Sequence, residues 1–223
     1  MKKKLLLKKD LLIQKKSFLF LFLYGIFMFI VFNNPVFEDM IYIMGMIIAV
    51  YFFIATASFE DEKNKSEIIL NSLPLSRSQI VLAKYLSVFA YILIGAVFLG
   101  IVGLLFKLSA FPTTPRLIKA VDLLAAGLLV SVYVSIYFPM YFRFGASALR
   151  LFSVVFFLIF FFMPRYLLNL YLAYENTEAV RLLNKLFLEQ SPFILAIVVI
   201  FVILVLMTVS FLISRSIYSR KEF

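Results

Sequence analysis

Six long apolar runs, each bounded by charges or by Asn and Pro, constrain this chain more than any other feature of its sequence. They cover residues 17–32, 40–59, 80–106, 123–141, 151–163 and 193–213. About 20 helical residues cross the hydrocarbon core of a bilayer. Since 64% of the 223 residues are hydrophobic and 15% are charged, one soluble core could not bury them. The sequence therefore predicts an all-α polytopic membrane protein, a single domain over 1–223 with six transmembrane helices.

The fifth run is short and stops at Pro164, which Arg165 follows directly. Three outcomes remain open: the span tilts little, the bilayer thins locally, or the span continues into "YLLNLYL" after the proline. The following segment, 165–190, alternates apolar and charged residues at helix-like spacing. We expect it to be extracellular and amphipathic, with short helices at the outer surface.

The distribution of lysine and arginine sets the orientation. Assuming six spans, sixteen of the 22 lie on the side that holds both termini. The positive-inside rule then places both termini in the cytoplasm. Seven lysines are in the basic N-terminal arm, 1–16, and they favour anionic membrane lipids. The leucines of this arm do not segregate to one face, so a plain anchor and an interfacial helix remain alternatives.

Composition removes several kinds of chemistry. Cysteine and histidine are absent, which excludes disulfides, thiolate metal sites and histidine-based catalysis. The apolar runs contain no Asp, Glu or Arg. Lys84 falls near a cytoplasmic end, and Asp122 lies just outside a run. Ion-coupled carriers usually bury such groups at mid-membrane, and no Walker A pattern is present. Energy for active transport would therefore come from another subunit.

The polar interruption at 60–79, which we call the elbow, has a defined build. "FEDEKNKSE" is expected to be solvated, and Ile69, Leu70 and Leu73 give the next short helix an apolar side. Pro74 disfavours helical geometry at the residue before it and should end that helix. The elbow is either a well-made loop or a rigid element that transmits force.

A helix-start signal follows the proline. Ser76 and Gln79 have the spacing of a capping box, and Leu75 and Ile80 that of a hydrophobic staple. Lys84 lies one turn further on, where its side chain can extend to the membrane interface. The third span should thus begin at a fixed point.

The stretch "EDEKNKSEIILNSLPLSRSQIVLAKYLS" resembles the first cytoplasmic loop of type-2 ABC transporter permeases. In that family an acidic-basic cluster precedes a short helix, then "LP-x-SR" and a lysine that leads into the third span. The basic arm, the six-span layout and the outer segment match as well. The resemblance implies these ATPase-coupling residues: Glu60, Glu62, Ile69, Leu70, Leu73, Pro74, Ser76, Arg77 and Lys84.

The resemblance also implies a division of labour. A separate ABC ATP-binding subunit would dock on the elbow and hold the ATP and magnesium, so this chain would carry no catalytic residue and no cofactor. A second permease subunit would complete a homo- or heterodimer in the bacterial cytoplasmic membrane, with no nucleic-acid partner. Composition is closest to permeases that export amphipathic peptides such as the phenol-soluble modulins. The expected cargo is hydrophobic or amphipathic: a peptide, a toxin or a lipid-like molecule.

A membrane scaffold or assembly protein that transports nothing is the alternative. A channel is disfavoured because no span offers a polar ring. Small residues recur four apart at Gly127, Ser131 and Ser135, and likewise in the pairs Ala96–Gly100 and Gly45–Ala49; we expect packing within the chain rather than a subunit interface.

Aromatic residues give two further expectations. Five tyrosines near predicted span ends indicate an interfacial aromatic belt: Tyr137, Tyr141, Tyr166, Tyr171 and Tyr174. The "FFLIFFFM" run at 156–163 would face lipid rather than a hydrophobic substrate.

Overall fold

The chain forms a bundle of helices, seen here in a computed structural model that describes residues 9, 17–32, 37, 40–72, 76–109, 116–183 and 191–221. In chain order the helices are α2 (Ser17–Phe32), α3 (Ile41–Lys63), α4 (Ser66–Ser72), α5 (Arg77–Leu108), α6 (Ala120–Phe144), α7 (Arg150–Ala173), α8 (Glu178–Leu183) and α9 (Pro192–Ser219). The regular elements in these ranges are all helical, which confirms the predicted all-α class.

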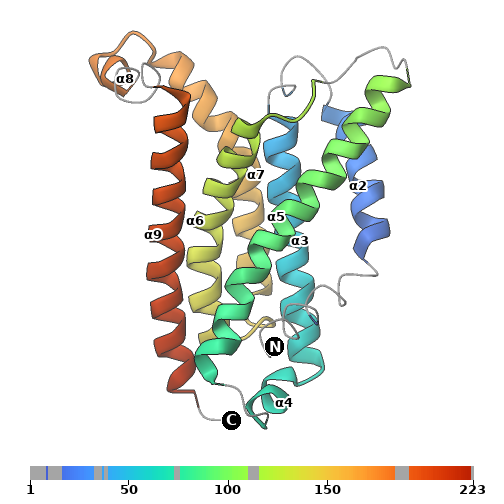
Figure 1. Ribbon diagram of the computed structural model, residues 1–223, viewed down its shortest axis with the longest axis vertical. Coiled ribbons are helices and arrows are strands. Elements are labelled where there is room, and N and C mark those ends of the chain that lie inside the picture. Colours follow the sequence, from blue (N-terminus) through green and yellow to red (C-terminus); the bar gives the residue numbers. More distant parts are fainter. Residues whose placement is uncertain are drawn as a thin grey trace.

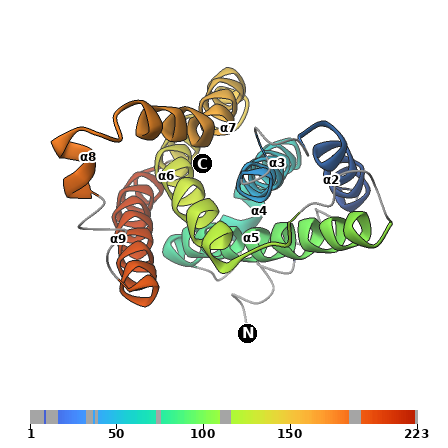
Figure 2. The same cartoon turned by 90° about the horizontal axis from the view of Figure 1, so that it is seen from above.

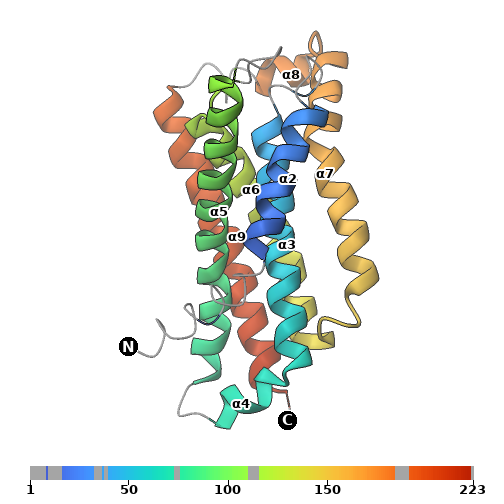
Figure 3. The ribbon, with the colours of Figure 1, turned by 90° about the vertical axis from the view of Figure 1, so that its right-hand side faces the viewer.

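The long helices run side by side, with short α4 at one end of the bundle and short α8 at the other (Figures 1 and 3). The end of α9 returns to the end that carries α4. Seen along the bundle, α3 lies between α2 and α6, and α9 lies on the outer side of α6 (Figure 2). Helix α6 packs most extensively against α9, and α3 against α5 and α6.

Four helices, α3, α5, α6 and α9, are long and apolar enough to cross a membrane among the residues described. Within its most apolar stretch α3 is 72% buried, whereas α9 is 17% buried; α3 therefore forms the centre of the bundle and α9 presents an apolar face outward. Helix α2 is shorter, at 16 residues, and α7 has 24. That the chain crosses the membrane six times stays a prediction.

Small residues allow the helices to approach one another inside the chain. Gly45 of α3 faces Leu99 of α5, and Gly95 of α5 faces Ala49 of α3. On α6, Gly127 faces Ile203 of α9. These contacts confirm the expected intrachain packing for the α3 pair and for the first member of the α6 stripe.

Helix α7 continues through Pro164 to Ala173, so the proline does not end the helix, as the third of the three alternatives for the fifth run requires; whether the membrane span itself continues stays a prediction. A proline removes one backbone donor and bends a helix, but the residues that follow it here favour helix. The last turns of α7 lean towards α8 (Figures 1 and 2). Between 156 and 163, Leu158, Ile159 and Phe162 are exposed on the single chain; whether lipid or substrate faces them stays a prediction.

The prediction of an interfacial aromatic belt was wrong for two of the five tyrosines. Tyr137 and Tyr141 are only 3% and 4% exposed, and their rings stack on each other inside the core. They lie one helical turn apart on the buried face of α6, which hydropathy alone does not distinguish from an interfacial position. Tyr166 and Tyr174 are exposed, as a belt requires.

Candidate functional site

The start of α5, at the end of the elbow, has the local structure that its sequence predicts. Ser76 is the N-cap of α5; its hydroxyl accepts from the backbone N–H of Gln79 (3.3 Å), and the Gln79 side-chain oxygen accepts from the N–H of Ser76 (3.2 Å). This is the predicted capping box, which fixes where the helix starts. Leu73, Pro74 and Leu75 lie outside the described residues.

Helix α4 presents one apolar residue to the outside and one to the core. Ile69 is 60% exposed, whereas Leu70 is partly buried and packs on the main core cluster. Glu60, on the last turn of α3, accepts a hydrogen bond from Asn64 (3.2 Å). Leu70 therefore packs the short helix against the core, and Ile69 stays available for contact with a partner.

Glu62 ties the elbow to the connection between α6 and α7. Its carboxylate accepts from the backbone N–H of Ala146 (2.5 Å) and of Ser147 (2.9 Å). Partial burial raises the pKa of Glu62, but the hydrogen bonds from this connection outweigh it and leave the pKa below its usual range. Gly145 precedes the bound amides with φ 83° and ψ 171°, a conformation that is essentially restricted to glycine.

Asp61 and Lys84 form an ion pair inside the bundle, at the end that carries α4. Lys84 Nζ is 2.5 Å from one carboxylate oxygen of Asp61 and Lys9 Nζ is 2.5 Å from the other. Asp61 is 3% and Lys84 is 7% exposed. Asp61 lies two residues after the end of its apolar run. Burial raises the pKa of Asp61, but the charges of Lys84 and Lys9 lower it by more, so the pKa lies below its usual range.

This pair corrects two expectations. The "FEDEKNKSE" stretch is not solvated throughout, because Asp61 is buried while Glu62 and Lys63 are exposed. Lys84 does not extend to the interface but turns inward to a buried carboxylate. A charge inside a low-dielectric bundle is stable only with such a partner. The isolated lysine in an apolar run was therefore the sequence signal for a buried acidic partner.

Arg77 joins the elbow to the end of the last helix. Its Nη1 donates to the backbone carbonyls of Ser219 (2.7 Å), Lys221 (3.0 Å) and Tyr218 (3.4 Å). Lys221 in turn forms an ion pair with Glu67 of α4 (2.7 Å). We call these four residues and Arg77 together the α9 clasp: Glu67, Arg77, Tyr218, Ser219 and Lys221.

The sequence interpretation missed the α9 half of this clasp. Ser210, Ser214 and Tyr218 lie four residues apart and are all buried, a stripe of the kind noted on α6 but not noted on α9. Ser210 and Ser214 both hydrogen-bond the hydroxyl of Tyr85, at 2.6 and 2.8 Å. The stripe therefore faces the beginning of α5.

A cleft of about 460 Å³ opens between the elbow, the end of α6 and Lys221, two residues after the end of α9. Its charged lining is of both signs and includes Glu62, Lys65, Glu67, Arg143 and Lys221. The elbow thus borders a cleft to which three separate parts of the chain contribute charged residues.

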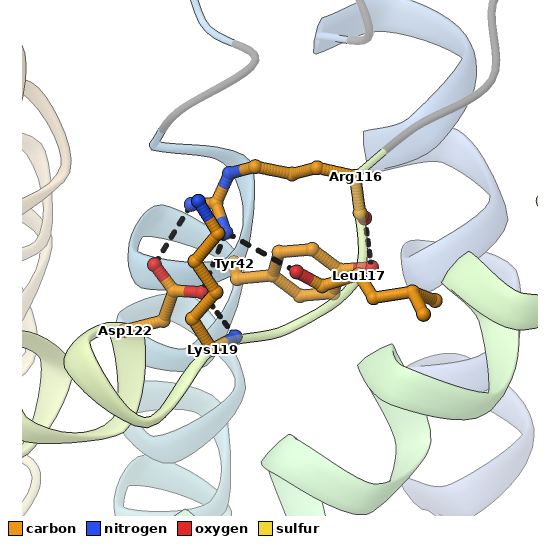
Figure 4. A network of polar contacts seen from close by, with 5 residues as sticks. All are labelled: Tyr42, Arg116, Leu117, Lys119 and Asp122. Carbon is orange, nitrogen blue, oxygen red and sulfur yellow. Dashed lines mark hydrogen bonds and ion pairs between the residues drawn. The ribbon is translucent and has the colours of Figure 1, made fainter.

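The opposite end of the bundle has its own polar network (Figure 4). Asp122 accepts two hydrogen bonds from the Arg116 guanidinium, both 2.7 Å, and one from the backbone N–H of Lys119 at 2.8 Å. Tyr42 of α3 donates to the Arg116 carbonyl (2.8 Å). These contacts fix the start of α6 against α3.

Of the nine residues expected to couple to an ATPase, the described ones gather at one end of the bundle. Arg77 and Lys84 reach α9 and α3, Glu62 holds the α6–α7 connection, and Ile69 faces outward. Among the described residues, no group of three or more acidic, His or Cys side chains could hold a metal ion. The arrangement can transmit a displacement between these parts of the chain.

Comparison with known protein families gives a match. The sequence profile of the family described as "ABC-2 family transporter protein" matches residues 5–219. No curated protein and no solved structure matches the chain. Because the profile covers nearly the whole length, including the elbow, the α6–α7 connection and the end of α9, the chain belongs to the ABC-2 family of transporter proteins.

Proposed function

We propose that the chain is the permease subunit of an ATP-driven exporter and that the elbow is the point at which a separate ABC ATPase subunit docks. The family membership supports a permease, and permeases of this family usually work with such a subunit. The observation that carries the docking point is Ile69, a large apolar side chain 60% exposed on a short helix.

The connections of the elbow support a role in transmission rather than in simple linkage. A loop that only joined two spans would not need side-chain contacts to three other parts of the chain. Glu62 reaches the α6–α7 connection, Asp61 reaches α5, and Arg77 reaches α9. A force on α4 would therefore reach several helices at once.

The remaining parts of the proposal follow from the sequence. The excess of Lys and Arg supports a cytoplasmic location for this end; in the proposal the membrane is bacterial, and a second permease subunit completes the dimer. The cargo is hydrophobic or amphipathic, in keeping with apolar faces such as that of α9. The alternative, a membrane scaffold that transports nothing, predicts no dependence on ATP.

Co-expression with an ABC ATPase subunit encoded beside this chain tests the proposal. Ile69→Asp should abolish co-purification of the ATPase and its stimulation, because it puts a charge where an apolar groove would receive the side chain. Ala148→Asp is the matched control, since Ala148 is exposed at the same end on a different element. If Ile69→Asp binds and stimulates the ATPase as well as the control does, α4 is not the docking helix. If the unmodified chain neither binds nor stimulates the ATPase, the scaffold gains support.

A further inference from the structure

The position of Arg77 is unfavourable for its own helix and favourable for another. Arg77 is the first residue of α5, where the positive end of the helix dipole disfavours a cation. Its Nη1 instead lies against the carbonyls at the end of α9, where a cation is stabilised. The last turn of α9 contains no basic residue, and Arg220 and Lys221 follow it; Arg77 adds a cation from another helix, and its Nη1 hydrogen-bonds the carbonyls at this helix end directly.

The rest of the α9 clasp makes the junction a packed one. Tyr218 is fully buried, and its ring makes an edge contact with Phe142 of α6 (5.2 Å between centroids). Tyr218 lines the same small cavity as Leu70 of α4 and Ile80 of α5. The end of α9 therefore lies where α4, α5 and α6 meet.

Two further contacts continue this attachment along α9. Tyr85, two turns after Arg77 on α5, bonds Ser214 and Ser210 of α9. Ser210 also donates to the carbonyl of Ser135 on α6 (3.1 Å). The beginning of α5, the second half of α9 and the middle of α6 are thus joined by successive polar contacts.

We propose that Arg77 is a positioning residue that makes the last helix move with the elbow, so that a displacement of α4 reaches α9 and, through it, α6. This inference rests on the proposed function, since it names the path that the ATPase-driven movement takes inside the chain. Ion pairs that reach solvent contribute little, so the partly exposed Glu67–Lys221 pair is secondary, and Arg77 with buried Tyr218 carries the attachment.

Three variants separate this role from a general structural one. Arg77→Met removes the donor. Arg77→Lys keeps it, because all three contacts come from one nitrogen and an ammonium carries three donors. Arg220→Met is the matched control, since Arg220 is an exposed arginine at the same end of α9.

The first measurement needs no ATPase. Hydrogen exchange on the purified permease in nanodiscs should be about tenfold faster in Arg77→Met at the backbone amides from Ser214 to Lys221, because an uncapped helix end opens more often. Arg77→Lys and Arg220→Met should exchange like the unmodified chain. Unchanged exchange in Arg77→Met would overturn the attachment itself.

The second measurement uses the permease with its ATPase. Arg77→Met should still bind the ATPase through α4 but lose most of the transport per ATP hydrolysed, and Arg77→Lys should restore it. If Arg77→Met exchanges faster but its transport per ATP hydrolysed is unimpaired, the transmission through α9 is overturned, whereas the attachment stands. If the unmodified permease neither binds nor stimulates the ATPase, the proposed function is overturned, and the transmission with it. The exchange measurement still tests the attachment of α9 in that case.

Discussion

Lys84 and Asp61 form a buried ion pair, with 2.5 Å between Nζ and Oδ2, that links the beginning of α5 to the end of α3. The pair lies between the elbow and the centre of the bundle. It therefore holds α3 and α5 together where the two helices meet the elbow. Removing one member leaves a buried charge without its partner, which is far more costly than removing both.

We predict that Asp61→Asn destabilises the protein by about 3–5 kcal/mol, because Lys84 then keeps a buried charge without a carboxylate. Lys84→Met should cost less, since Lys9 still faces Asp61, and the double variant should recover part of the loss. Thermal unfolding in detergent measures all three. Glu60→Gln, one residue away and not part of the pair, is the control; equal melting temperatures for it and Asp61→Asn would contradict the prediction.

Much of the fold could be predicted because hydropathy specifies helices in a membrane. Each of the six apolar runs corresponds to one helix, with Met40 of the second run lying one residue before α3, and the Ser76–Gln79 capping box is a local pattern that forms as its spacing requires. The course of α7 was harder to predict because a proline can either bend a helix or end it. Which outcome occurs depends on the residues around it in space.

The buried polar contacts of the site could not be read from local patterns. Asp61 and Lys84 are 23 positions apart, and only the packing of α3 on α5 brings them together. Arg77 was identified through its motif, but its partners at Tyr218, Ser219 and Lys221 are backbone carbonyls, and no side-chain pattern marks these. Tyr137 and Tyr141 were misplaced for a similar reason, because a tyrosine suits both a core and an interface.

Gly145→Ala should destabilise the protein by about 1–3 kcal/mol, because φ 83° with ψ 171° is strained for any residue with a Cβ. The added Cβ would also lie 3.3 Å from the Glu62 carboxylate, which the connection needs as an acceptor. Thermal unfolding tests this against Gly100→Ala, a glycine inside α5 whose Cβ would meet only an ordinary contact at 3.7 Å. We expect the control to be neutral or stabilising; an equal loss in both variants would show that the backbone of Gly145 is not constrained.

The orientation can be tested with single cysteines, because the chain contains none of its own. Asn176 lies next to α8 and Asn64 next to α4, and both residues are exposed. A cysteine at Asn176 should react with an impermeant thiol reagent added to intact cells, and a cysteine at Asn64 should react only after the cells are opened. A third site, Thr114, lies outside the described residues and should behave like Asn176. Labelling of Asn64 from outside would reverse the orientation and remove the elbow from the cytoplasm.

The capping box allows the stiffness of the elbow to be changed without removing its docking surface. Ser76 and Gln79 satisfy one backbone N–H each, and losing an N-cap side chain typically costs about 1 kcal/mol. A packed bundle should survive this loss, so the Ser76→Ala/Gln79→Ala variant should insert, purify and bind the ATPase through Ile69. The first turn of α5, which carries Arg77, should nevertheless become less ordered, and transport per ATP hydrolysed should fall. Ser78→Ala is the matched control, because it changes a serine in the same turn that is not part of the box. If the double variant and the control transport equally well, the start of α5 need not be rigid, and the movement must reach the bundle through Glu62 and Asp61 instead.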